Sequence, residues 1–139
     1  MRILLVEDNV GDARLVIEAL KECSVPTYVT VVSDGLQALA YLRREGQYAG
    51  VALPDLVLLD LNLPKMDGRE VLVAIKSDPA LQHIPVVIFT SSTADHEVLL
   101  AYRHGASCYL IKPLELANYF ALLQELVTFW GTRARLPVG

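Results

Sequence analysis

The sequence has no long apolar run and only two cysteines. Uninterrupted apolar stretches, such as residues 98–102, are far shorter than the roughly 18 residues that a membrane-spanning helix needs. The N-terminal segment, residues 1–6, meets an acid at Glu7 and is too short for a secretion signal. Cys23 and Cys108 belong to no paired Cys/His spacing, which argues against a disulfide framework and a zinc site. We therefore expect a cytoplasmic protein without a membrane segment.

The sequence also lacks an excess of positive charge. It has 12 Lys and Arg residues against 16 Asp and Glu residues, which gives a formal net charge of −4. Basic residues gather only at Arg43 and Arg44 and at Arg133 and Arg135. Proteins that bind the phosphate backbone need a broad basic surface. The charge balance therefore argues against nucleic acid as a direct partner.

Apolar residues are abundant and make up 53% of the 139 residues. A chain of this length usually forms one domain. Short β-type runs recur between longer helical patterns, at residues 2–6, 28–32, 56–59, 85–89 and 108–111. The first, third and fourth runs are continuously apolar, as expected for parallel strands buried on both faces. The sequence thus predicts five strands, together with a surplus of apolar side chains that needs an explanation.

Helical patterns fill the intervals between these strands, and the last helix is predicted to span residues 115–130. Ser92, with Asp95 three residues later, resembles a capping box at the start of the fourth helix. Alternating strands and helices form a parallel sheet joined by right-handed crossovers, with helices on both faces. The predicted fold is therefore α/β, a doubly wound parallel (βα)5 sheet.

Polar residues follow four of the predicted strands directly. Glu7 and Asp8 come after the first strand, Asp60 after the third, Thr90 after the fourth and Lys112 after the fifth. In open α/β sheets the functional site lies outside the carboxyl ends of the strands. Each of these residues alone is more often a helix cap or a solvated loop residue. The argument for a site therefore depends on their coincidence.

Three carboxylates would meet if the first and third strands are neighbours. Glu7, Asp8 and Asp60 would then crowd three negative charges into one crevice, which requires a cation or raised pKa values. Oxygen-only ligands favour Mg²⁺, which commonly binds one or two carboxylates together with phosphate oxygens. A metal beside a carboxylate, the Thr90 hydroxyl and the Lys112 ammonium group suggests phosphoryl chemistry with an aspartate as nucleophile. No His or Cys follows any of the strands, so a nucleophile–base relay has no candidate.

Four ordered segments carry the strongest signal. They are ILLVEDN at residues 3–9, LLDLNLP at 58–64 with MDG at 66–68, VIFTS at 87–91, and the stretch from Gly105-Ala106 through Tyr109 to Lys112-Pro113. Over about residues 2–127 this set resembles the receiver domains of two-component response regulators. The resemblance implies a flavodoxin-like fold with strand order 2-1-3-4-5. It also implies a phosphoacceptor signalling protein rather than an enzyme.

The resemblance implies a role for each residue at the strand ends. Asp60 looks like the phosphoacceptor, which a histidine kinase would phosphorylate in a Mg²⁺-dependent reaction. Asp8 looks like a direct Mg²⁺ ligand and Glu7 like a ligand through water, with the backbone carbonyl of Asn62 completing the coordination. Lys112 looks like the phosphate-binding cation.

Further implied roles concern the conformational switch and the lifetime of the phosphate. Thr90 resembles the switch hydroxyl that turns toward the phosphate, and Tyr109 resembles the aromatic residue coupled to it. Asn62 and Ser92, two residues beyond the acceptor and the switch hydroxyl, occupy positions that tune dephosphorylation. Pro113 matches a position where the family usually has a cis peptide bond.

Other features resemble the small stand-alone regulators that are paired with phytochrome histidine kinases. They are DA at residues 12–13, the long loop before Pro54-Asp55, GREVL at 68–72, SDP at 77–79 leading to IPVV at 84–87, and CY at 108–109. This resemblance implies that the partner kinase senses light, with specific pairing around Arg14 and residues 17–19 of the first helix. It implies a receiver domain over residues 1–130 and a short tail, residues 131–139, without an output domain.

Nine large apolar side chains lie on the predicted final helix. Together they cover about half of its circumference, whereas docking on a sheet needs only somewhat more than about 100°. One interpretation is a deeply set helix capped by the tail. The other is a homodimer or partner interface on this helix, extending to the fourth. Its candidate residues are Tyr119, Leu122, Leu126, Phe129 and Trp130.

Three other hypotheses remain open. A metal-dependent phosphatase with an Asp nucleophile expects a second acid two residues after Asp60, where Asn62 stands. A flavodoxin-like redox domain expects a Gly-rich or hydroxyl-rich phosphate loop after the first strand, whereas residues 7–9 would repel a phosphate. The third hypothesis is a receiver-shaped interaction module that is never phosphorylated.

Overall fold

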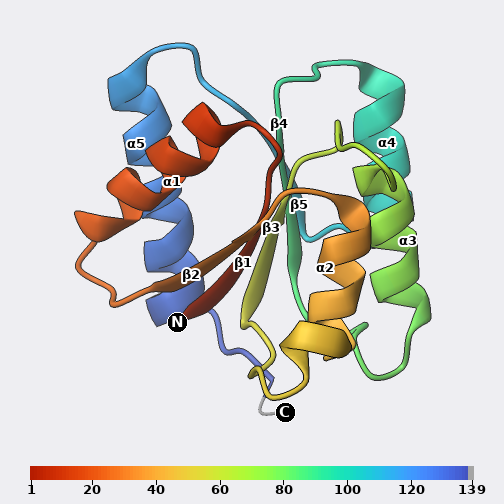
Figure 1. Cartoon of the computed structure of the whole chain (residues 1–139). Coiled ribbons are helices and arrows are strands. Elements are labelled where there is room, and N and C mark those ends of the chain that lie inside the picture. Colours follow the sequence, from red (N-terminus) through yellow and green to blue (C-terminus); the bar gives the residue numbers. More distant parts are fainter. Residues whose placement is uncertain (138–139) are drawn as a thin grey trace.

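The computed structural model describes residues 1–137, in which five strands alternate with five α-helices (Figure 1). The strands are β1 (Arg2–Val6), β2 (Tyr28–Val32), β3 (Leu56–Leu59), β4 (Val86–Thr90) and β5 (Cys108–Ile111). The α-helices are α1 (Val10–Lys21), α2 (Gly35–Leu42), α3 (Gly68–Ser77), α4 (Asp95–Arg103) and α5 (Leu116–Thr128). A short 3-10 helix, η1 (Gly46–Tyr48), follows α2, and a π-helix, η2 (Phe129–Arg133), follows α5.

The sheet is parallel throughout, with the strand order β2-β1-β3-β4-β5. The residue Val6 pairs with Val32 of β2 on one side and with Leu59 of β3 on the other. The inner strands β3 and β4 are buried along their whole length, which explains their continuously apolar sequences. The predicted doubly wound fold with strand order 2-1-3-4-5 is confirmed.

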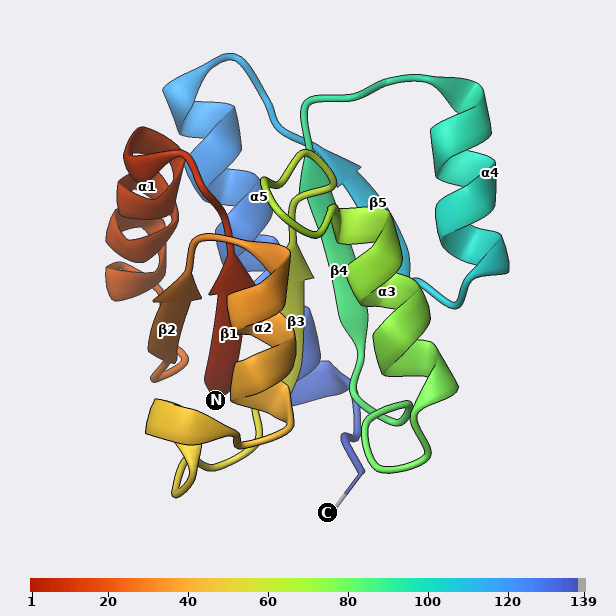
Figure 2. The same ribbon diagram turned by 45° about the vertical axis from the view of Figure 1, so that its right-hand side comes forward.

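The sheet separates two apolar cores. The helices α1 and α5 cover one face, and α2, α3 and α4 lie on the other (Figures 1 and 2). Along β1, Leu4 and Val6 pack into the core beneath α2 and α3, whereas Ile3 and Leu5 pack into the core beneath α1 and α5. Because both faces of the inner strands are buried, two cores rather than one absorb much of the apolar surplus.

Three of the five α-helices in the described residues begin with a side-chain cap, whereas α4 and α5 do not. The helices α1, α2 and α3 each begin at an Asn or Asp whose side chain accepts a hydrogen bond from a backbone N–H of the first turn. The predicted capping box of Ser92 and Asp95 is wrong, because α4 begins at Asp95 and its N-cap is Ala94. Ser92 lies two residues too early to cap this helix, and its Oγ accepts from the Ala94 N–H at 3.5 Å.

After α5 the chain passes the end of the sheet where β3 and β4 begin. The α-helix ends at Thr128, two residues before the predicted end at Trp130, and the backbone continues as the π-helix η2. Leu136 and Pro137 then line a hollow together with Pro54, at the amino end of β3. The predicted domain boundary at residue 130 falls inside η2, and residues 138–139 of the predicted tail lie outside the described residues.

The backbone departs from one expectation, at Pro113. Residues 1–137 contain no cis peptide bond, so the expected cis bond before Pro113 is wrong. The trans form of a bond before proline is favoured by roughly 0.5–1 kcal/mol, so it needs no special contact. No helix in the described part of the chain is long and apolar enough to cross a membrane.

Candidate functional site

The carboxyl ends of β1 and β3 bring three carboxylates together. The backbone N–H of Asp60 donates to the carbonyl of Val6 at 3.1 Å, which fixes the end of β3 beside the end of β1. Carboxylate oxygens of Glu7, Asp8 and Asp60 therefore lie within 4.8 Å of one another. Glu7 and Asp60 are buried, whereas Asp8 is exposed. The residues that the sequence places at neighbouring strand ends thus share one site.

Asp60 lies at the centre of a hydrogen-bond network. Its Oδ1 accepts from the Thr90 hydroxyl at 3.0 Å and from the backbone N–H of Asn62 at 3.1 Å. Its Oδ2 accepts from the ammonium group of Lys112 at 2.9 Å. Thr90 comes from β4 and Lys112 follows β5, so the elements beyond β3 supply a hydroxyl and a cation to this carboxylate. The side chain of Asn62 itself is exposed.

Lys112 is shared among several acids. Besides Asp60, its Nζ donates to Glu7 Oε1 at 2.5 Å and to Asp12 Oδ2 at 3.1 Å. Only 7% of the Lys112 side chain is exposed. One buried ammonium group therefore donates to three carboxylates and offsets part of their charge.

Burial and charge shift two pKa values in this site. Burial raises the pKa of Glu7 to about 7; the hydrogen bond from Lys112 opposes this shift and the charge of Asp60 adds to it. Burial also disfavours the charged form of Lys112, but the hydrogen bonds and charges of Glu7 and Asp60 outweigh it and raise its pKa. At neutral pH Lys112 is a cation, and Glu7 titrates close to neutrality.

Asp12 is a member of the network that the strand-end argument missed. It lies in the first turn of α1, where Asn9 caps the helix, and its Oδ1 accepts a hydrogen bond from the Tyr119 hydroxyl at 3.1 Å. A signal was available in the sequence, because Asp12 lies in the first turn of the helix that directly follows Glu7 and Asp8. Asp12 connects Lys112 to α5 through Tyr119.

Gly68 allows α3 to begin against the end of β3. A Cβ at this position would lie 2.2 Å from the backbone oxygen of Asp60 and 2.7 Å from the Cα of Leu61. The Gly68 N–H donates to the Leu61 carbonyl at 3.0 Å, which closes the loop of residues 61–67. Only glycine fits this contact, so the close approach helps to hold the backbone of Asp60 in place.

The predicted switch residues point in different directions. Thr90 is completely buried and its hydroxyl is directed at Asp60. Tyr109 is half-buried, and its hydroxyl donates to the backbone carbonyl of Ser92 at 2.9 Å. No hydrogen bond joins the two side chains, but Thr90 begins the segment of residues 90–92 and Tyr109 binds its end at Ser92. A movement of this segment would therefore change the hydrogen bonds of both residues.

The donor set fits a hard divalent cation. Three carboxylates offer oxygen atoms, and neither His nor Cys belongs to the cluster within residues 1–137. Oxygen ligands of this kind suit Mg²⁺ and Mn²⁺. The exposed Asp8 gives the cluster access to solvent, as an exchangeable ion requires.

The final helix only partly matches the predicted interface. Tyr119 and Leu126 are buried, with 4% and 9% of their surface exposed, so they do not form an interface. Tyr119 packs edge-on against Phe89 at a centroid distance of 5.2 Å, because α5 contacts both the sheet and α1. Leu122 and Trp130 are half-buried, and only Phe129 is largely exposed, at 53%. The wide apolar arc is therefore explained mainly by burial.

Comparisons with known proteins agree with this geometry. Residues 3–124 match the family described as response regulator receiver domain. The response regulator Rcp1 of Synechocystis sp. is 44% identical over 137 residues, which cover 99% of this chain and 93% of Rcp1.

Two solved structures are similar over nearly the whole chain. The crystal structure of the phosphorylated cyanobacterial phytochrome response regulator RcpA has a TM-score of 0.95 at 48% identity, covering 99% of this chain and 98% of RcpA. The Mn²⁺-bound form of Rcp1 has a TM-score of 0.93 at 44% identity, covering 99% of each chain.

A parallel 2-1-3-4-5 sheet with an acidic metal-binding cluster at its carboxyl edge defines a phosphoacceptor module of two-component signalling. The chain belongs to the response regulator receiver domain family, and within it is similar to the phytochrome response regulators. This membership sets aside the hypotheses of a metal-dependent phosphatase and of a flavodoxin-like redox domain.

Proposed function

We propose that Asp60 accepts a phosphoryl group from a histidine kinase in a Mg²⁺-dependent reaction. The observation that carries the proposal is the convergence of donors on one buried carboxylate. The Lys112 ammonium, the Thr90 hydroxyl and the Asn62 backbone N–H all lie within 3.1 Å of an Asp60 oxygen. Such donors neutralise and orient phosphoryl oxygens, which is the main contribution of a protein to phosphoryl transfer.

The bonding changes are simple. A carboxylate oxygen of Asp60 forms a bond to phosphorus, while the P–N bond of a phosphohistidine breaks and its electron pair returns to the imidazole. Mg²⁺ bound by Glu7, Asp8, Asp60 and the Asn62 carbonyl would supply positive charge to the phosphoryl oxygens. Lys112 already donates to the acceptor carboxylate and offers its charge to the new phosphate.

Thr90 and Tyr109 form the switch in this proposal. The Thr90 hydroxyl exchanges its hydrogen bond to Asp60 for one to the phosphate, and the shift of residues 90–92 reaches Tyr109 through the Ser92 carbonyl. Asn62 and Ser92, at the rim of the site, tune the rate at which water removes the phosphate.

The test of the acceptor is the intact mass of the protein after incubation with acetyl phosphate, with and without Mg²⁺. Wild type is expected to gain one phosphate only with Mg²⁺, and hydroxylamine should remove it because it is an acyl phosphate. Asp60→Asn should gain none, whereas Asp95→Asn, which alters an exposed acid of α4, should behave as wild type. Absence of a phosphate from wild type would instead favour the interaction module that is never phosphorylated.

We infer that the donor is a phytochrome-type histidine kinase, because RcpA, to which this chain is similar, is described as a phytochrome response regulator. Pairing would use the exposed face of α1, where Arg14 is exposed and Ile17 half-buried; Ala19 is fully buried and makes no contribution. Arg14→Glu should slow phosphoryl transfer from such a kinase but leave the reaction with acetyl phosphate unchanged. An equal loss with both donors would contradict docking through α1.

We also propose a homodimer through the end of the final helix, now centred on Phe129. This exposed ring packs edge-on against Trp130 at 5.6 Å, and Leu122 is half-buried nearby on α5. Sedimentation of wild type and of the double variant Leu122→Ala/Phe129→Ala, with and without beryllofluoride, tests the proposal. Identical sedimentation of both proteins in both conditions would rule this interface out.

A further inference from the structure

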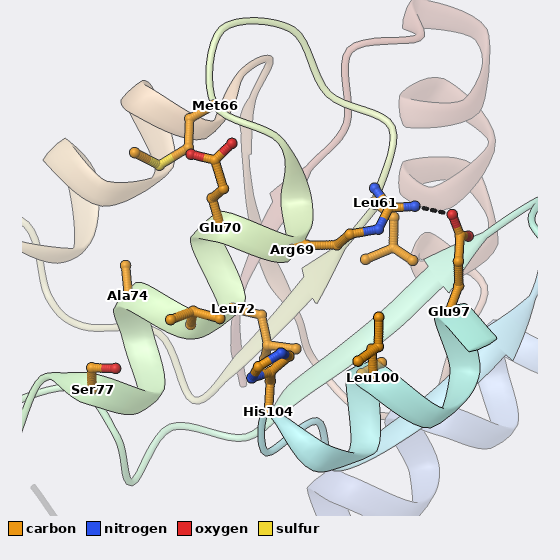
Figure 3. A pocket seen from close by; sticks show the side chains of 12 residues that line it. Leu61, Met66, Arg69, Glu70, Leu72, Ala74, Ser77, Glu97, Leu100 and His104 are labelled. Carbon is orange, nitrogen blue, oxygen red and sulfur yellow. Dashed lines mark hydrogen bonds and ion pairs between the residues drawn. The ribbon is translucent and has the colours of Figure 1, made fainter.

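Two cations in residues 1–137 each bind more than one acid, and one of them, Arg69, lies in a groove between α3 and α4. This α3–α4 groove has a volume of about 510 Å³ and an apolar lining that includes Leu61, Leu72, Val73, Leu100 and Ala101. Arg69 forms an ion pair with Glu97 (Figure 3) and another with Asp67 at 3.1 Å. A planar guanidinium group binds carboxylates along fixed directions, so these two contacts orient it.

The other cation, Lys112, has no such built-in direction. A lysine ammonium group is a compact charge on a flexible four-carbon stem. The Lys112 N–H donates to the Thr90 carbonyl at 2.8 Å, which fixes the backbone but leaves the side chain free to turn. A hollow of about 260 Å³ adjoins this side chain, with Asp12, Ser91 and Tyr119 in its lining. Because there is space to turn into, packing alone does not hold the ammonium group.

Three acids in residues 1–137 bind Lys112, and Asp12 alone among them lies outside the metal-binding cluster. The Lys112 Nζ donates to Asp12 Oδ2 at 3.1 Å, whereas its other two partners, Glu7 and Asp60, belong to that cluster. A divalent cation bound by Glu7 and Asp60 would repel the nearby ammonium group. The charge of Asp12 is then the one that Lys112 does not share with the cation.

The Asp12 carboxylate is itself held at both oxygens. Its Oδ1 accepts from the Tyr119 hydroxyl at 3.1 Å, while Oδ2 accepts from Lys112. The backbone N–H of Asp12 donates to Asn9 Oδ1 at 2.9 Å, which fixes the start of α1. Burial, together with the charge of Asp12, raises the pKa of Tyr119, so its hydroxyl stays protonated as a donor. With one donor on each oxygen, the carboxylate has a defined orientation.

Tyr119 is a rigid support for this carboxylate. Only 4% of Tyr119 is exposed, and its ring packs edge-on against Phe89 at a centroid distance of 5.2 Å. The Phe89 ring in turn lies 5.8 Å from the Lys112 Nζ, within the range of a cation–π contact. Since Asp12 is on α1 and Tyr119 on α5, the packing of these two helices determines where the ammonium group lies (Figures 1 and 2).

We propose that Asp12, anchored by the Tyr119 hydroxyl, is a positioning residue that holds the Lys112 ammonium group in place for the phosphoryl group on Asp60. Neither Asp12 nor Tyr119 touches the reacting atoms, and both act through Lys112. This inference rests on the proposed acceptor role of Asp60 and deepens it, because it assigns the orientation of the phosphate-binding cation to a contact between α1 and α5.

The first test measures the mobility of Lys112 in metal-free, unphosphorylated protein. In protein labelled with ¹³C-lysine, NMR relaxation gives the order parameter of the Lys112 Cε methylene group. We expect this order parameter to fall in Asp12→Asn and in Tyr119→Phe, because each loses part of the anchor. That of Lys65, whose side chain is 63% exposed, should stay the same.

The second test measures the rate of phosphorylation by acetyl phosphate at saturating Mg²⁺. Asp12→Asn should be slower by about tenfold, since a misplaced group can cost up to about 100-fold and Lys112 keeps two other partners. Tyr119→Phe keeps the ring against Phe89 and should be slower by about threefold. The double variant should be no slower than Asp12→Asn, because the Tyr119 hydroxyl acts through Asp12.

Matched controls separate positioning from charge and from stability. Tyr119→Phe keeps every charge, so its Mg²⁺ affinity, measured by calorimetry, should equal that of wild type. Glu22→Gln removes an exposed acid at the other end of α1, and Tyr28→Phe removes a hydroxyl from a tyrosine that is 70% exposed. Both controls should react at the rate of wild type. Urea unfolding establishes that each variant is folded under the conditions of the assay.

Three results would overturn the proposal. These are an unchanged order parameter of Lys112 in Asp12→Asn, additive losses of rate in the double variant, and a faster reaction in Asp12→Asn. The last would show that Asp12 competes with the phosphate for Lys112. Absence of a phosphate from wild type would overturn the proposed function and this inference together, whereas an unchanged order parameter beside normal phosphorylation of wild type would overturn this inference alone.

Discussion

The strand-end site and the α3–α4 groove each contain a cation held by acids, but at different depths. In the site, the Lys112 side chain is 7% exposed and binds three carboxylates. In the groove, the Arg69 side chain is 35% exposed and binds two. Charge interactions strengthen as water is excluded, and breaking a buried pair leaves an uncompensated charge. The same kind of ion pair should therefore be worth several times more at the strand ends than in the groove.

Removal of the buried cation should have the largest effect. Lys112→Met leaves Glu7, Asp12 and Asp60 without their ammonium group, so the free energy of unfolding at pH 8 should fall by about 3–5 kcal/mol. The loss should shrink toward pH 5, because Glu7, whose pKa is raised to about 7, is then protonated. Urea unfolding at both pH values measures this. The control Lys65→Met removes an exposed cation beside Asp34 and should cost less than about 1 kcal/mol.

Substitution of Gly68, which lies between the two regions, should have the second largest effect on the free energy of unfolding. In Gly68→Ala the new methyl group would overlap the backbone of Asp60, and the displacement should cost about 2–3 kcal/mol of unfolding free energy. Phosphorylation by acetyl phosphate should slow as well, since the acceptor backbone shifts. Gly50→Ala is the matched control, because a Cβ there meets nothing within 4 Å. Equal thermal unfolding temperatures for the two variants would refute the importance of the close approach.

The pH dependence of stability should be smaller but specific to the site. The pKa of Glu7 is raised to about 7 from an ordinary value of 4.5. Its contribution is therefore fully present below about pH 4.5 and is lost as the pH rises through about 7. In EDTA, the free energy of unfolding of wild type should decline by about 2 kcal/mol more than that of Glu7→Gln between pH 5 and 8. Parallel profiles would contradict the raised pKa.

The smallest effect should come from the ion pair in the groove. A double-mutant cycle with Arg69→Met and Glu97→Gln should give a coupling energy of about 1 kcal/mol, because Arg69 is partly solvated. The more exposed pair of Lys21 and Glu18 should give about 0.3 kcal/mol in the same measurement. A coupling energy in the groove as large as the loss in Lys112→Met would overturn the comparison.

The strands were predictable because their apolar runs are short, continuous and bounded by polar residues. Each observed strand lies within one residue of its predicted range, and Glu7, Asp60 and Thr90 follow or end their strands as expected. Parallel order then decides which strand ends meet. The start of α4 was harder to predict from the sequence. Ser92 and Asp95 have the spacing of a capping box, but residues 91–94 form the connection from β4 to α4, so the helix begins only at Asp95.

Features that depend on contacts between helices could not be predicted in the same way. Helical periodicity gives the width of the apolar arc on α5 but not what covers it, so Tyr119 and Leu126 were assigned to an interface although α1 and the sheet bury them. The groove was also invisible in the sequence. Arg69 and Glu97 are 28 positions apart, and no local pattern joins them.

The position of Lys112 has a consequence for the growing chain. Its contact with Glu7 closes a loop of 105 residues, and contacts between such distant positions form only after the intervening chain has ordered. A chain that emerges from the ribosome N-terminus first presents its acids long before it presents their cation. The site is thus assembled only when β5 joins the sheet, so a half-made molecule holds every acid of the signalling centre but not its cation.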